Sequence, residues 1–225
     1  MALFLSLGLF ADNEIYIDQT GDNASIDIEQ LGSTNIIGGL DAVAGTMTAA
    51  VLNGGTMTLD INQIGSSNKF LTDGIYGTNF TGFFEFDGDS NEWDFSMDTS
   101  GLNTADSNDI NIDVSGSFNL ADIDIAEVSG ASFLDIDWII TGDSNDAEVD
   151  IDADYAKMYM DIFGDSNDLT FIQSGYGASS SDRKYFSLDL DGSNNTAVIK
   201  QQSTLAADWL TIESNASNSN ICIIQ

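Results

Sequence analysis

The chain has 225 residues, of which 37 are Asp or Glu and 5 are Lys or Arg, so its formal net charge is −32 at pH 7. Nucleic acid and anionic membranes repel such a chain, and neither is expected as a direct partner. The sequence has no His, which excludes imidazole bases and the usual transition-metal sites. Hydrophobic residues make up 42% of the chain, so a folded protein is expected rather than a disordered acidic tail.

The chain begins with an apolar run over residues 1–11, in which Leu3, Leu5, Leu7 and Leu9 occupy alternate positions. This run is too short to span a bilayer, so no membrane insertion is expected. It lacks the positively charged start of a signal peptide. We expect it to be retained as an opening strand or cap that packs on the first coil or on another subunit. Cleavage as a signal peptide is the alternative.

A short sequence motif then recurs along the chain: an Asn, alternating apolar residues, a Gln or Asp, and a Gly. It begins at Asn13 and again at Asn23, and residues 58–68 repeat it. The glycines that close it lie roughly eleven residues apart, and the residues between them alternate with the period of a strand. The pattern predicts an all-β protein: a β-solenoid with two strands per ~22-residue coil and Asn/Gly-rich turns.

Most turns carry a variant of Gly-Asp/Ser-Ser-Asn. Gly accepts a positive φ, and the polar residues bond their own backbone. If the same Asn recurs in every coil, side-chain amides can bond up and down the axis, as in amide ladders. We therefore predict a structural ladder, with unrelated surface turns as the alternative. Its predicted members are Asn13, Asn23, Asn68, Asn91, Asn108, Asn145, Asn167 and Asn195.

No shift in composition divides the chain, so residues 1–225 are predicted to form a single solenoid domain. The repeat is interrupted at residues 38–55 and 174–184, where loops are expected to leave the solenoid. The second loop holds Arg183 and Lys184, two of the few basic residues. Loops on a rigid scaffold often carry contacts, which makes this segment a candidate partner surface, with a solvated loop as the alternative.

Two segments predict contact surfaces between subunits. Phe83 and Phe84 are neighbours on one predicted strand and cannot both face inward. With Trp93 they mark a candidate interface, unless a broadened coil encloses the rings. The last strand holds Ile221 and Ile223 and has no charge or Pro to block further strands, so either another subunit covers it or the protein polymerises end to end.

The recurring motif resembles the curlin-type repeat, and residues 12–35 and 55–68 match it best. The resemblance implies a two-stranded β-solenoid that is built for assembly or surface display and has no active site. It weakens toward the C-terminus, where the Gln position is often Asp or hydrophobic.

The acidic residues fall on the solvent-facing positions of the predicted strands. When these strands stack, like charges on neighbouring strands repel one another. Salt, or adventitious Ca²⁺ or Mg²⁺, is expected to relieve this repulsion without a dedicated metal site or cofactor. No phosphate-binding loop is present, and a carboxylate-pair glycosidase is the one enzyme class left open.

We therefore expect a non-enzymatic structural protein whose partners are protein subunits of the same or another kind, in a homo-oligomer or a larger assembly. The favoured setting is a virion, as a capsid decoration or a tail or fibre appendage of a marine phage. The alternative is a secreted curli-like fibre or adhesin subunit, extracellular or at the cell surface.

Overall fold

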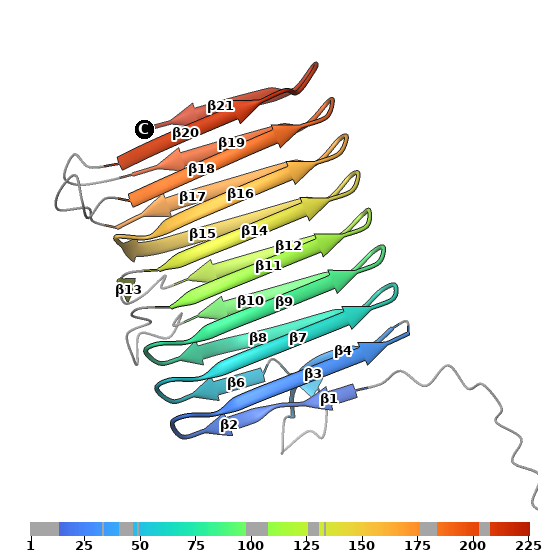
Figure 1. Cartoon of the computed structure of the whole chain (residues 1–225), viewed down its shortest axis with the longest axis vertical. Coiled ribbons are helices and arrows are strands. Elements are labelled where there is room, and N and C mark those ends of the chain that lie inside the picture. Colours follow the sequence, from blue (N-terminus) through green and yellow to red (C-terminus); the bar gives the residue numbers. More distant parts are fainter. Residues whose placement is uncertain are drawn as a thin grey trace, which may run out of the picture.

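The computed structural model describes residues 14–32, 34–40, 47–48, 50–97, 108–125, 131–132, 134–175, 184–202 and 208–225. Within these ranges the chain contains 21 strands and no helix. The strands form two sheets that face each other and run the length of the molecule, each built almost wholly from parallel neighbours (Figure 1). The predicted all-β solenoid with two strands per coil is thus confirmed.

One sheet has eight strands, and consecutive members come from consecutive coils. They are β3 (Ser25–Leu31), β7 (Thr58–Ile64), β9 (Thr81–Asp87), β11 (Asp109–Ser115), β14 (Asp135–Thr141), β16 (Lys157–Phe163), β18 (Lys184–Asp191) and β20 (Asp208–Ser214).

The opposite sheet has 13 strands. Its main path is β1 (Glu14–Tyr16), β4 (Ile36–Leu40), β8 (Lys69–Tyr76), β10 (Glu92–Met97), β12 (Leu120–Ile125), β15 (Asp146–Asp154), β17 (Asp168–Ser174), β19 (Thr196–Gln201) and β21 (Asn220–Ile224). Beside it lie β2 (Asp18–Thr20), β5 (Met47–Thr48), β6 (Ala50–Asn53) and β13 (Ala131–Ser132).

The core lies between the two sheets and is built from columns of inward-facing side chains. Parallel strands pair residue for residue, so one inner position repeats from coil to coil. One such column consists of Ile28, Ile61, Phe84, Ile112, Trp138, Met160, Leu188 and Ile212. Each coil buries its apolar face against its neighbours, which is why the alternation in the sequence appears as a continuous dry interior.

Each coil turns twice, once at each edge of the two sheets, and the coils differ in length because only one edge has the same turn in every coil. The turns from β3 to β4, β7 to β8 and onward, on the right of Figure 1, have one form throughout. Along this edge the offset between equivalent Asn residues ranges from 22 residues (Asn145 to Asn167) to 33 (Asn35 to Asn68). The additional residues lie elsewhere in the coils, and the ~22-residue repeat is the shortest coil rather than the rule.

The two predicted loop excursions are narrower than expected. Residues 36–40 and 50–53 remain in the sheet as β4 and β6, both of which pair with β8. Ser174 still belongs to β17, and Lys184 already belongs to β18. Residues 41–46, 49 and 176–183 lie outside the described part of the chain, as does the predicted opening strand over residues 1–11.

Candidate functional site

A ladder of buried Asn side chains runs along the uniform edge. From Asn68 onward, the side-chain oxygen of each Asn accepts a hydrogen bond from the backbone N–H of the Asn one coil earlier. The N–O distance is 2.9 Å from Asn68 to Asn91 and 2.8 Å from Asn145 to Asn167. The ladder contains Asn35, Asn68, Asn91, Asn119, Asn145, Asn167 and Asn195, and it ends on the hydroxyl of Ser219.

The chemistry of this ladder differs from the predicted one, because the amides bond backbone groups rather than each other. Asn195 Nδ2 donates to the carbonyl of Gly164 at 2.9 Å, and Asn145 Nδ2 donates to that of Gly116 at 3.2 Å. These side chains therefore satisfy backbone groups that the turns would otherwise leave buried and unpaired.

Direct amide-to-amide bonding occurs instead between Gln side chains inside the core. Gln63 Nε2 donates to Gln30 Oε1 at 2.7 Å, and Gln201 Nε2 donates to Gln173 Oε1 at 2.9 Å. Gln225 extends the second pair at 3.1 Å.

Two predicted ladder members lie elsewhere, and a third, Asn13, is outside the described residues. Asn23 is exposed, with φ of 60°, in a turn of the opposite edge. Asn108 is buried at that same edge, where it accepts from the N–H of Phe80 at 2.8 Å. Similar turn motifs occur at both edges of the coils. The distance from a turn glycine to an Asn therefore does not show on which edge that turn lies.

Asn35 and Asn119 were missed, although each is the third residue after a turn glycine, Gly32 or Gly116, as in the predicted members. Thr34 and Phe118 stand directly before these two Asn residues, where the motif used for the prediction has Ser in most turns. Counting three residues from each turn glycine to an Asn, whatever lies between, would have found both.

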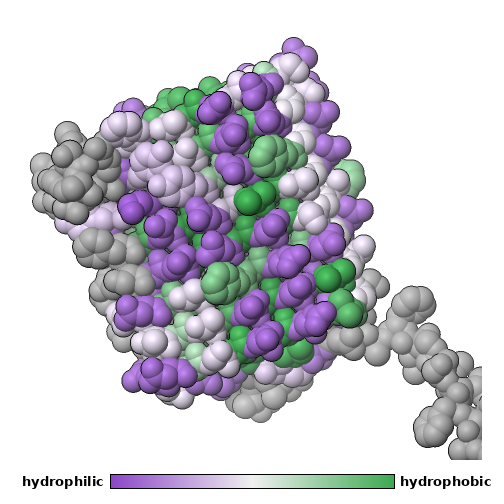
Figure 2. Space-filling view, viewed as in Figure 1, coloured by the Kyte–Doolittle hydropathy of each residue, from purple (hydrophilic) through white to green (hydrophobic). Residues whose placement is uncertain are grey.

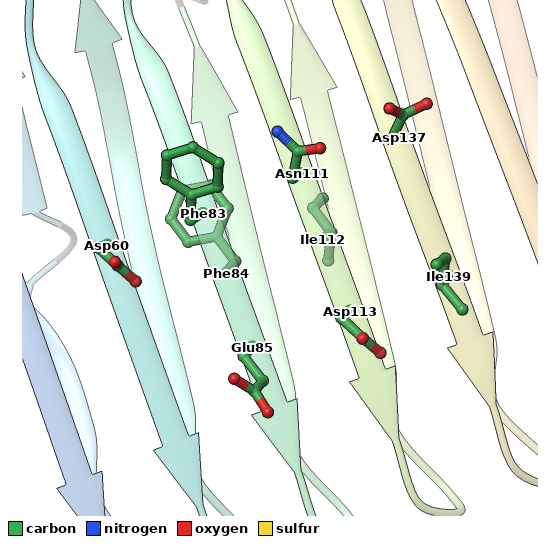
Figure 3. A pocket seen from close by; sticks show the side chains of 9 residues that line it. All are labelled: Asp60, Phe83, Phe84, Glu85, Asn111, Ile112, Asp113, Asp137 and Ile139. Carbon is green, nitrogen blue, oxygen red and sulfur yellow. The ribbon is translucent and has the colours of Figure 1, made fainter.

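The predicted interface around Phe83, Phe84 and Trp93 is wrong for two of its three residues. Phe84 and Trp93 are 4% and 3% exposed and lie in the core, whereas Phe83 is 43% exposed. Figure 3 shows the two neighbouring rings on opposite sides of β9. The coil is broad enough to enclose the rings: Phe86 stacks on Trp93 with 4.4 Å between ring centroids. The alternative of a broadened coil therefore holds here.

The outer face of the eight-stranded sheet carries a shallow hollow of about 370 Å³ over β9, β11 and β14 (Figure 3). Phe83 and Ile139 form its apolar walls, with Asn111 between them. Its residues are Asp60, Phe83, Phe84, Glu85, Asn111, Ile112, Asp113, Asp137 and Ile139. Figure 2 shows this mixture of hydrophilic and hydrophobic side chains continuing over the face. No group of three or more His, Cys, Asp or Glu among the described residues is arranged to hold a metal ion.

Carboxylates that stack in register destabilise one another's charged form. Partial burial raises the pKa of Asp137, with Asp135, Asp109 and Asp161 adding to the effect. Burial and the charge of Asp189 likewise raise the pKa of Asp161. Burial and the paired charge of Asp168 do the same for Asp146. At these three positions, repulsion between carboxylates on neighbouring coils therefore adds to the effect of burial.

The C-terminal end of the solenoid exposes apolar side chains. Ile223 and Ile224 of β21 are 48% and 49% exposed, and Trp209 of β20 is 47% exposed. Ile221 is partly buried against the core. Among the described residues, β21 pairs with β19 alone and β20 with β18 alone. Of the predicted interface residues, Ile223 is thus exposed at an open end, Ile221 is half-covered, and Leu3, Leu5, Leu7 and Leu9 lie outside the described part.

In the described ranges no helix has the length and hydrophobicity to cross a membrane. The chain matches no family model, no curated protein and no solved structure, so fold and geometry carry the functional argument.

Proposed function

We propose that this chain is a non-enzymatic structural subunit that joins a larger assembly through its C-terminal end. The observation that supports this most strongly is the exposure of Ile223, Ile224 and Trp209 on terminal strands whose free edges can accept further strands. Exposed apolar patches of this kind mark contact surfaces, and an uncovered strand edge is a template for pairing.

Charge directs association to this end and away from the sides. On the flanks, acidic residues face each other in register from strand to strand, as Asp161 and Asp189 do, and the net charge is −32. Side-by-side contacts between copies would bring these carboxylates together. In contrast, β21 reads Asn-Ile-Cys-Ile-Ile and carries no charge. A strand added there meets no carboxylate on β21, so the hydrophobic gain is not opposed by repulsion.

The proposed setting is a virion, where the subunit would serve as a capsid decoration or as a tail or fibre appendage. A rigid, acidic repeat protein of the kind that the sequence predicts fits this setting. The second candidate is a secreted curli-like fibre or adhesin subunit. It is favoured by the amide ladders, because Gln225 carries the Gln column to the last coil and a further coil of the same type could continue it.

Sedimentation velocity with negative-stain microscopy tests the proposal, on the full chain in buffer with seawater concentrations of Na⁺, Mg²⁺ and Ca²⁺. The wild-type chain is expected to associate, and Ile223→Asp to remain monomeric. Ile139→Asp places the same change on the flank, where Ile139 is 39% exposed, and should leave association intact.

Unbranched filaments would support the fibre setting, and small closed oligomers would support an appendage. A wild-type chain that stays monomeric at every concentration would contradict assembly through this end. Association that Ile139→Asp abolishes and Ile223→Asp does not would place the contact on the flank and also refute the proposal.

A further inference from the structure

Lys184 is a buried cation in the core of an otherwise acidic protein. Its side chain has no exposed surface, and it occupies the inward position at a corner of the coil, directly after Ala156 in the column. The Gln173–Gln201 pair lies at the same corner, where Gln173 Nε2 donates to the carbonyl of Ala156 at 3.2 Å. A buried amine needs partners, and this polar corner supplies them.

The amine of Lys184 has two partners in the next coil. It donates to the carbonyl of Gln202, and it lies 3.4 Å from Oδ1 of Asp208. Lys184 and Asp208 are paired residues on the adjacent parallel strands β18 and β20. Asp208 Oδ1 is itself buried, so the contact between the two groups lies away from solvent.

Burial works against the charged form of this amine, whereas the neighbouring carboxylates stabilise it. Burial lowers the pKa of Lys184, although the charge and hydrogen bond of Asp208, together with the charges of Asp152 and Asp154, act in the opposite direction. Desolvated lysines beside a carbonyl carbon are the lysines that act as nucleophiles. Proximity in a folded chain replaces a collision between separate molecules with a step inside one structure.

We propose that Lys184 and Asp208 join in an isopeptide bond that covalently ties β20 to β18. A proton passes from the ammonium to the carboxylate, and the neutral Nζ attacks Cγ of Asp208. The Nζ–Cγ bond forms, one Cγ–O bond breaks, and that oxygen leaves as water with two of the three ammonium protons. No oxidant, reductant or other reactant is required.

The position of this bond gives it a mechanical role. It lies beside β20 and β21, where Trp209 and Ile223 are exposed and the core residue Leu210 is only partly buried. A coil with a neighbour on one side alone frays most readily. A covalent link from β18 to β20 prevents that coil from separating, whichever partner covers the end.

Intact mass spectrometry of the full chain, folded and then denatured, tests the proposal directly. The wild-type chain is expected to be lighter than its sequence by one water molecule. Lys184→Arg keeps a cation but removes the attacking amine, and it should have the full mass. Asp208→Asn should lose ammonia in place of water. Lys157→Arg is the matched control, because Lys157 forms an exposed ion pair with Asp135 at 3.8 Å and should not alter the deficit.

Trypsin locates the link, since the chain has few cleavage sites. The sites are Lys69, Lys157, Arg183, Lys184 and Lys200. The linked chain resists cleavage after Lys184 and yields residues 184–200 joined to residues 201–225 as one branched peptide. A wild-type chain of full mass that gives only linear peptides would overturn the proposal, and so would a mass deficit traced to any other pair of residues.

Discussion

Replacing Asn145 with Ala is expected to lower the free energy of unfolding by about 3–5 kcal/mol, because the change removes two buried hydrogen bonds and leaves one buried N–H without an acceptor. Asn145 Oδ1 accepts from the N–H of Asn119 at 2.9 Å, and its Nδ2 donates to the carbonyl of Gly116 at 3.2 Å. Each bond contributes about 1 kcal/mol, and the buried N–H of Asn119 adds a desolvation penalty of about 1–3 kcal/mol when it has no acceptor.

The size of the loss distinguishes the ladder from an ordinary turn. Asn145→Ser should lose less than Asn145→Ala, because a hydroxyl can accept the backbone N–H, as Ser219 does for Asn195 at 3.0 Å. Asn111→Ala is the control: Asn111 lies on the outer face, where its amide donates to Asp109 at 3.2 Å, and a surface change there is expected to cost less than about 0.5 kcal/mol. Urea unfolding of the four proteins measures the differences. An Asn145→Ala loss no larger than that of Asn111→Ala would refute the reasoning.

Three further predictions follow from the stacked strands. Asp137, Asp146 and Asp161 bind protons more tightly in the folded chain than in the unfolded one, because their pKa values are raised. Their protonation therefore stabilises the fold as pH falls from 7 toward the ordinary pKa of Asp, and a melting temperature that is flat or falls over that range would argue against it. Addition of 1 M NaCl should raise the melting temperature, because the screening length shortens to about 3 Å; a chain that salt leaves unchanged or destabilises would contradict the repulsion. Gly142→Ala should cost more than about 2 kcal/mol in urea, because φ is +145° and the new Cβ would lie 1.8 Å from the carbonyl oxygen of Gly116. Tolerance of this change would show that the turn does not stack as described.

The sequence by itself determined the fold class, because the information needed is local. Strict alternation, as in Asp109–Ser115, specifies a strand with one dry face, and recurring turn glycines specify a bend after each strand. A repeat of fixed period lets each coil bury its apolar side against its neighbours when the coils stack, so the repeat favours a β-solenoid. The absence of charge on β21, where Ile223 is exposed, is also a local feature that the sequence shows directly.

Tertiary structure decided which of the similar turn motifs lie on the same edge of the coils and which side of a strand faces the core. Asn23 and Asn119 each follow a turn glycine, yet they lie on opposite edges of the coils, because an edge is defined by the whole length of chain between two turns. Phe84 rather than Phe83 enters the core, because its position is in register with Ile61 and Ile112 of the neighbouring coils. The contact between Lys184 and Asp208 likewise depends on pairing between strands of neighbouring coils. Local patterns specify strands and turns, whereas contacts between coils depend on residues that are distant in sequence and meet only when the coils stack.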